Sequence, residues 1–164
     1  MVKAIMGLKG SGKTKQLIDS INTAIKNESG SMVCIEKGSA LRFDIDYRVR
    51  LIDASEYPIG SYALLKGFIS GLHAGNFDIT HIFIDGLYKL SGTSDHEETA
   101  EFLAWLEKFG EANNMSFTLS ISADPAACPE SITKEKHNRS RASGSGFLRY
   151  NRVLRSSSAV SGIR

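Results

Sequence analysis

The chain has 164 residues, of which 41% are hydrophobic and 23% charged, with 15 Gly and 3 Pro. This is the composition of one globular domain, and it excludes collagen-like, disulfide-scaffold and wholly disordered chains. No run approaches the roughly 18 consecutive apolar residues of a membrane span, and no export signal precedes the first apolar run. We therefore expect a cytoplasmic protein with no membrane partner. Cys34 and Cys128 are far apart and predict neither a disulfide framework nor a metal site.

The formal net charge of +2 conceals two segments of opposite charge. Residues 1–136 carry all 18 carboxylates against 14 basic residues, whereas residues 137–164 carry six arginines and no acidic residue. We expect one domain over residues 1–136 and a poorly ordered, basic, Ser- and Arg-rich tail over residues 137–164. The tail has no Lys, which favours a frameshifted or vector-derived end over a native flexible arm attracted to phosphate backbones.

Strand-like and helix-like segments alternate along the domain. Short apolar runs predict strands at residues 2–6, 32–35, 47–54, 79–84 and 115–122. Apolar positions at helical spacing predict helices over residues 13–30 and 61–75, and another that opens at a capping-box pattern from Ser94 to Glu97. Pro129 marks a last short helix. Such alternation is typical of βαβ units, so we expect an α/β domain with a mainly parallel sheet covered on both faces.

Residues 7–14, Gly-Leu-Lys-Gly-Ser-Gly-Lys-Thr, match the phosphate-binding pattern G-x-x-x-x-G-K-[ST] at every fixed position. The glycines let the backbone curl so that its N–H groups point at a phosphate, and the helix that follows adds the positive end of its dipole. A chance Gly-rich turn is the alternative, but a strand precedes the loop and a helix follows it, as the motif requires. The residues expected to contact phosphate are Gly7, Lys9, Gly10, Ser11, Gly12, Lys13, Thr14 and Lys15.

The same loop predicts a magnesium site. Lys13 would reach the β- and γ-phosphate oxygens, and the Thr14 hydroxyl would ligate Mg²⁺. Asp85 ends an apolar strand and is the acid expected to hold the metal opposite Thr14, although Asp85-Gly86 is also an ordinary turn dipeptide. Asp53 also follows an apolar pair and ranks second.

A general base is harder to place. Many P-loop ATPases carry Glu directly after the magnesium-site acid, and here that position is Gly86. Glu36, at the end of the strand after the P-loop helix, could face the terminal phosphate and orient a water molecule. A solvated Glu36 beside Lys37 is an equally weighted alternative. Lys13 and Glu36 are thus the catalytic candidates.

Other polar residues carry weaker signals. Arg42, Arg48 and Arg50 are the only arginines of the domain, and a solvated strand is favoured over a clamp on the γ-phosphate. His81 is interpreted as structural. Lys89 and the tyrosine before it follow Asp85, where a base or ribose could pack.

The order of these motifs resembles the RecA-type ATPase core found in recombinases, replicative helicases and circadian-clock ATPases. The resemblance covers about residues 1–130 and is carried by the P-loop, the strand ending at Glu36, the Ile82–Leu87 segment and the Phe117–Ser122 segment. The chain is also similar to small P-loop proteins of Firmicutes that are often labelled ATP-binding proteins or twitching-motility ATPases, although twitching motors are much larger.

The resemblance implies a three-layer, RecA-like P-loop NTPase that uses ATP, with Glu36 as the catalytic carboxylate and Ser120 or Ser122 near the γ-phosphate. Many relatives carry Gln or Asn at that last position, so the serines weaken the case for coupled hydrolysis. No DNA-binding loops of useful length intervene.

We therefore expect a protein that binds ATP and Mg²⁺ and hydrolyses ATP slowly. Self-assembly or a protein partner would complete the site, and nucleic-acid binding is left open. A nucleotide-gated regulatory module without turnover is the alternative, favoured by Gly86. A small-molecule phosphotransferase ranks third, because such kinases usually close an arginine-bearing lid and the domain's arginines all fall within residues 42–50.

Overall fold

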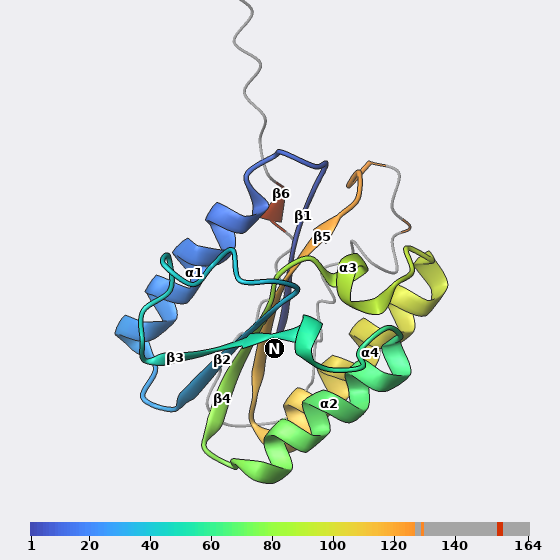
Figure 1. Cartoon of the computed structure of the whole chain (residues 1–164). Coiled ribbons are helices and arrows are strands. Elements are labelled where there is room, and N and C mark those ends of the chain that lie inside the picture. Colours follow the sequence, from blue (N-terminus) through green and yellow to red (C-terminus); the bar gives the residue numbers. More distant parts are fainter. Residues whose placement is uncertain (127–128, 130–153, 156–164) are drawn as a thin grey trace, which may run out of the picture.

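The computed structural model describes residues 1–126, 129 and 154–155 (Figure 1). Five parallel strands form a sheet with helices on both faces, so the predicted α/β class and parallel sheet are confirmed. The strands are β1 (Val2–Gly7), β2 (Ser31–Glu36), β3 (Val49–Asp53), β4 (Ile79–Ile84) and β5 (Ser116–Ser122). The helices are α1 (Lys13–Asn27), α2 (Tyr62–Gly75), α3 (Leu87–Ser91), α4 (His96–Asn113) and a 3-10 turn, η1 (Ala54–Glu56).

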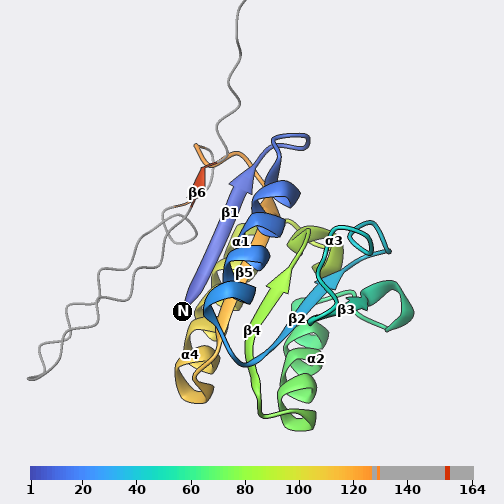
Figure 2. The ribbon, with the colours of Figure 1, turned by 90° about the vertical axis from the view of Figure 1, so that its left-hand side faces the viewer.

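The strand order is β3-β2-β4-β5-β1. The connection from β1 to β2 therefore crosses β5 and β4, and it carries α1 over one face of the sheet, while α2, α3 and α4 cover the other (Figure 2). The chain leaves β1 and β4 toward opposite faces. Ligands of open α/β sheets bind at the carboxyl ends of strands where the connections diverge in this way.

A two-residue strand, β6 (Leu154–Arg155), pairs in parallel with the outer edge of β1. Of residues 137–164, the structure describes only these two. The predicted tail is otherwise outside the described residues, and so is the helix predicted after Pro129.

Strands β1, β2 and β4 are buried on both faces, which explains their largely apolar sequences, whereas Arg50 of the edge strand β3 is exposed. In β4, Ile82 and Ile84 pack against the face covered by α2, α3 and α4, and Phe83 packs against α1. All three side chains are fully buried, and each such burial contributes about 1.5–3 kcal/mol to folding. The sheet is thus a rigid platform for the loops at its ends.

The structure corrects one local prediction and adds one helix that was not predicted. The capping residue of α4 is Asp95 and not Ser94: Asp95 Oδ1 accepts the N–H of Glu98 at 2.9 Å. Helix α3 was not predicted, because five residues are too few to display a helical period. It lies between two glycines in the left-handed region, Gly86 (φ 71°) and Gly92 (φ 70°).

Within the part of the chain that the structure describes, no helix combines the length and apolar character needed to cross a bilayer.

Candidate functional site

Residues 7–14, the predicted P-loop, connect β1 to α1 at the carboxyl edge of the sheet. Gly10 and Gly12 have φ angles of +82° and +81°, which favour glycine, and a Cβ at either position would meet nothing within 4 Å. These glycines are therefore required by their backbone conformation, because a larger side chain would have room at either position. Gly12 caps α1 without any side-chain hydrogen bond, so the first N–H groups of the helix lack a side-chain partner. Ser11 Oγ is buried and has no hydrogen-bond partner among the described residues.

The side chain of Lys13 folds back toward the beginning of the predicted P-loop. Its side chain is only 7% exposed, and its Nζ donates to the carbonyl of Leu8 at 2.8 Å. Burial lowers the pKa of Lys13; the carboxylate of Asp85 opposes this effect and the positive charge of Lys89 adds to it. The ammonium is thus poorly solvated, and an anion would be a stronger partner for it than a neutral carbonyl.

Thr14 and Asp85 meet although they are 71 residues apart in the sequence. Thr14 Oγ1 lies 3.3 and 3.4 Å from the two carboxylate oxygens of Asp85. Ser120, on the strand between β1 and β4, donates to Asp85 Oδ1 at 2.7 Å and accepts the N–H of Gly86 at 2.7 Å. Ser120 therefore fixes the orientation of Asp85 toward the P-loop helix.

The chemistry of these two groups fits Mg²⁺. The ion prefers oxygen ligands at about 2.0–2.1 Å and usually takes one or two protein groups together with water and substrate phosphates. Thr14 and Asp85 supply such oxygens. Among residues 1–126, no group of three or more His, Cys, Asp or Glu side chains could hold a metal ion.

Asp53 and Glu36 are paired in register at the carboxyl ends of β3 and β2, farther from the P-loop than Asp85. Asp53 caps η1 through the N–H of Ser55 at 2.9 Å, and it also accepts the N–H of Gly38 at 2.8 Å. The structure thus brings Asp85, and not Asp53, to Thr14.

Glu36 is only 3% exposed, so its interpretation as a solvated side chain is wrong. Its Oε1 accepts the N–H of Leu41 at 3.0 Å, which closes the loop that follows β2. Burial raises the pKa of Glu36; the hydrogen bond from Leu41 opposes the rise, and the charges of Asp85 and Asp53 add to it. Glu36 is therefore near the site but already has a structural partner.

The remaining predicted residues divide clearly by exposure. Ser120 is buried, whereas Ser122 is exposed. The arginines Arg42, Arg48 and Arg50 are exposed, and Arg48 forms an ion pair with Asp46 at 3.0 Å, as expected of a solvated segment.

His81 was predicted to be structural. Its Nδ1 lies 3.0 Å from Glu28 Oε1 and its Nε2 lies 2.9 Å from Thr118 Oγ1, and its ring stacks on Phe83. These contacts occupy both ring nitrogens and support that interpretation.

A polar hollow of about 550 Å³ lies at the opposite, amino end of the sheet. It is lined by residues 29–31, 77–80 and 113–114, and Asp78 is its only charged group. Since it contains no cation, the hollow does not suit a phosphate ligand.

A scan against models of protein families and a search of curated proteins found no match to the chain. The interpretation of the site therefore depends on its own residues.

Proposed function

We propose that this chain is a RecA-like P-loop NTPase that binds ATP with Mg²⁺ and hydrolyses ATP slowly. The observation that carries the proposal is the meeting of Thr14 with Asp85, since the two residues come from separate segments that a chance Gly-rich turn would have no reason to bring together. The positive φ angles of Gly10 and Gly12 and the partly desolvated Lys13 support it independently.

Each residue has a distinct role in this proposal. Main-chain N–H groups of residues 7–15 cradle the phosphates, and Lys13 leaves the carbonyl of Leu8 to neutralise phosphate charge. Thr14 and Asp85 would hold Mg²⁺, which would supply positive charge to neutralise the terminal phosphates. Ser120 keeps Asp85 in place.

A regulatory module that binds nucleotide without turnover is the second candidate, and two observations favour it. Glu36 is buried with its carboxylate bound to the N–H of Leu41, and glycine follows Asp85 where a base would otherwise stand. The hydrogen bond from Leu41 ties Glu36 Oε1 to the loop that follows β2, which is consistent with slow hydrolysis at most.

Calorimetry with the full chain tests nucleotide binding. We expect saturable binding of ATP with Mg²⁺ by the wild type, and at least a tenfold loss of affinity in Lys13→Ala, because a charge-assisted hydrogen bond contributes about 1.5–3 kcal/mol. Lys26→Ala, at the exposed far end of α1, removes the same charge and should bind like the wild type. The absence of binding with both ATP and GTP would refute the proposal.

An ATPase assay on the same proteins separates the two candidates. If Lys13→Ala abolishes turnover and Glu36→Gln lowers it while both Glu36→Gln and wild type still bind ATP, the chain is an ATPase that uses Glu36. Binding without any turnover that depends on Lys13 would favour the regulatory module.

A further inference from the structure

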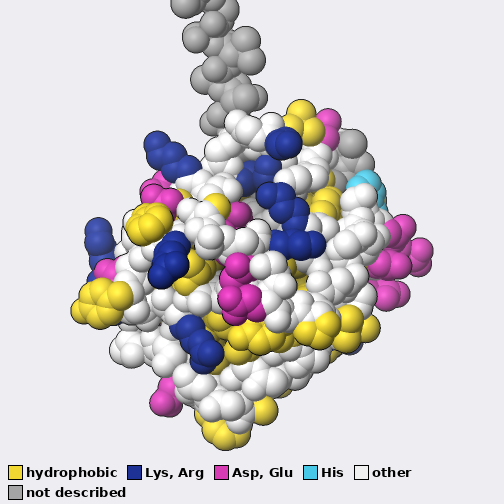
Figure 3. Space-filling model, in the orientation of Figure 1, with side chains coloured by type: hydrophobic (Ala, Val, Ile, Leu, Met, Phe, Trp, Pro, Cys, Tyr) yellow, Lys and Arg dark blue, Asp and Glu magenta, His cyan; other side chains and the backbone are white. Residues whose placement is uncertain are grey.

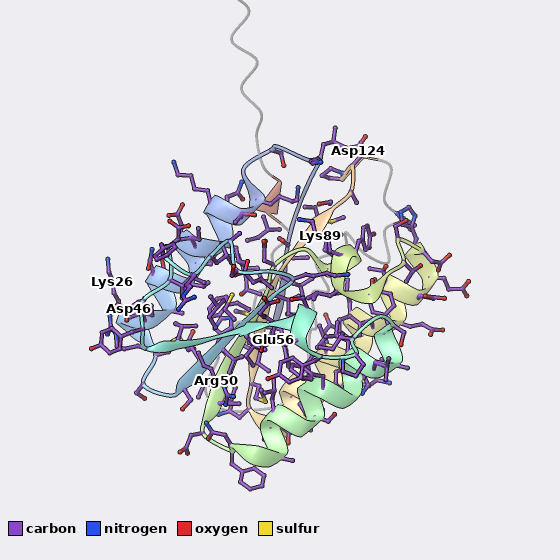
Figure 4. All side chains as sticks on the ribbon, viewed as in Figure 1. Lys26, Asp46, Arg50, Glu56, Lys89 and Asp124 are labelled. Atoms are coloured by element: carbon purple, nitrogen blue, oxygen red, sulfur yellow. The ribbon has the colours of Figure 1, made fainter. Side chains whose placement is uncertain are left out.

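Three lysines lie at the carboxyl edge of the sheet, each on a different connection. Lys13 ends the P-loop, Lys37 follows β2, and Lys89 lies in α3 just after β4. Lys37 Nζ lies 3.4 Å from the carbonyl of Lys89, so the connections that follow β2 and β4 meet here. Figure 3 shows dark-blue side chains gathered on this face, and Figure 4 labels Lys89 at α3.

The side chain of Lys89 folds back toward the magnesium-site acid. A Cβ built on Gly86 would lie 3.2 Å from Lys89 Cδ and 3.6 Å from its Cγ, so the aliphatic stem covers the backbone directly after Asp85. The N–H of Lys89 donates to the carbonyl of Gly86 at 2.9 Å, which fixes the stem at its base. The left-handed backbone conformation of Gly86 lets the chain turn directly after Asp85 into α3, which carries Lys89.

Burial lowers the pKa of Lys13, and the positive charge of Lys89 lowers it further. Among the described residues, Lys89 takes part in no ion pair, and the nearby carboxylate of Asp85 is already bonded to Ser120. The carboxylate of Asp85 offsets only part of the repulsion between the ammonium groups of Lys13 and Lys89. A polyanion bound between them would relieve the repulsion.

Arginines do not provide this charge. Arg42, Arg48 and Arg50 are exposed, and Arg48 is paired with Asp46. Of the described cations, Lys89 is the one whose charge acts on Lys13.

We propose that Lys89 is a specificity-determining residue, a second cation for the terminal phosphate that makes the P-loop site prefer nucleoside triphosphates over diphosphates. The proposal rests on the proposed nucleotide binding. Lys13 would reach oxygens of the β- and γ-phosphates, and Lys89, on the side of Asp85, would add a second positive charge for the terminal phosphate. A diphosphate would gain little from it.

The test compares the affinities of the full-length wild type, Lys89→Ala and Lys89→Arg for the β,γ-imido analogue of ATP and for ADP, each with Mg²⁺, by calorimetry at fixed ionic strength. We expect Lys89→Ala to bind the triphosphate analogue about tenfold more weakly while its affinity for ADP changes less than twofold. Lys89→Arg should retain most of the preference. Lys26→Ala is the control for loss of one positive charge.

The possible results separate the two proposals. Equal losses for both nucleotides, or no loss for either, would overturn the role of Lys89 while leaving nucleotide binding intact. If the wild type binds neither nucleotide, the proposed function itself fails. Because Lys89 is exposed, we expect the variants to fold, and a thermal unfolding curve checks this.

Discussion

The hydrogen bonds of Ser120 allow a quantitative test of the site without any ligand. Ser120→Ala removes the donor to Asp85 Oδ1 and the acceptor for the N–H of Gly86, both at 2.7 Å. The serine is only 2% exposed, so water replaces its hydroxyl poorly. We expect the variant to be markedly less stable than the wild type and its Asp85 to be less well oriented.

The magnitude follows from the two bonds. A hydrogen bond to a charged group contributes about 1.5–3 kcal/mol, and leaving a buried donor unsatisfied costs about 1–3 kcal/mol. Asp85 and Gly86 are partly exposed and recover some of this loss through water. The expected decrease in the free energy of unfolding is therefore about 2–3 kcal/mol.

Urea denaturation at pH 7 without nucleotide measures this decrease, and Ser122→Ala is the matched control. Ser122 is on the same strand but is exposed, so its replacement should change stability by no more than about 0.5 kcal/mol. If Ser120→Ala is as stable as Ser122→Ala, the inferred role of Ser120 in holding Asp85 is wrong. In nucleotide titrations, Ser120→Ala should lose more affinity with Mg²⁺ present than with Mg²⁺ absent.

Two further predictions use the same denaturation assay. In Gly110→Ala the new Cβ would lie 2.7 Å from the carbonyl of Met115, and we expect a loss of about 1–3 kcal/mol. Gly67→Ala, in an open part of α2, should instead gain about 0.5–1 kcal/mol, so equal effects of the two changes would contradict the packing. Glu36→Gln removes a carboxyl whose pKa is raised in the folded state, so ionisation of Glu36 costs folding free energy once the pH rises above its ordinary value of about 4.3. The penalty is absent below that pH, grows as the pH rises from there toward the raised pKa, and is constant above the raised pKa. The stability of the wild type relative to Glu36→Gln should therefore fall as the pH rises above the ordinary value and then level off, and a difference that does not change with pH would refute the pKa shift.

The amino-acid sequence by itself determined the local elements and the loop that connects the first two of them. Strands β1, β2 and β4 are mostly apolar runs, β3 and β5 alternate, and each long helix carries its own period, so five strands and three long helices were recognisable. The P-loop was recognisable for the same reason, because its glycines, Lys13 and Thr14 are adjacent in the chain. Helix α3 escaped prediction because its stability comes from Leu87 and Leu90 packing into the core and not from a local pattern.

Only the tertiary structure decided which distant residues share the site. The sequence only ranks Asp85 above Asp53, since each acid follows an apolar segment, but the strand order separates β4 from β1 by a single strand and leaves β3 at the far edge. The same order buries Glu36 between two other acids and aligns Ser120 with Asp85. Whether a strand-end side chain binds a loop, a neighbouring strand or solvent depends on which strands lie beside it, and that depends on long-range packing that no short stretch of sequence encodes.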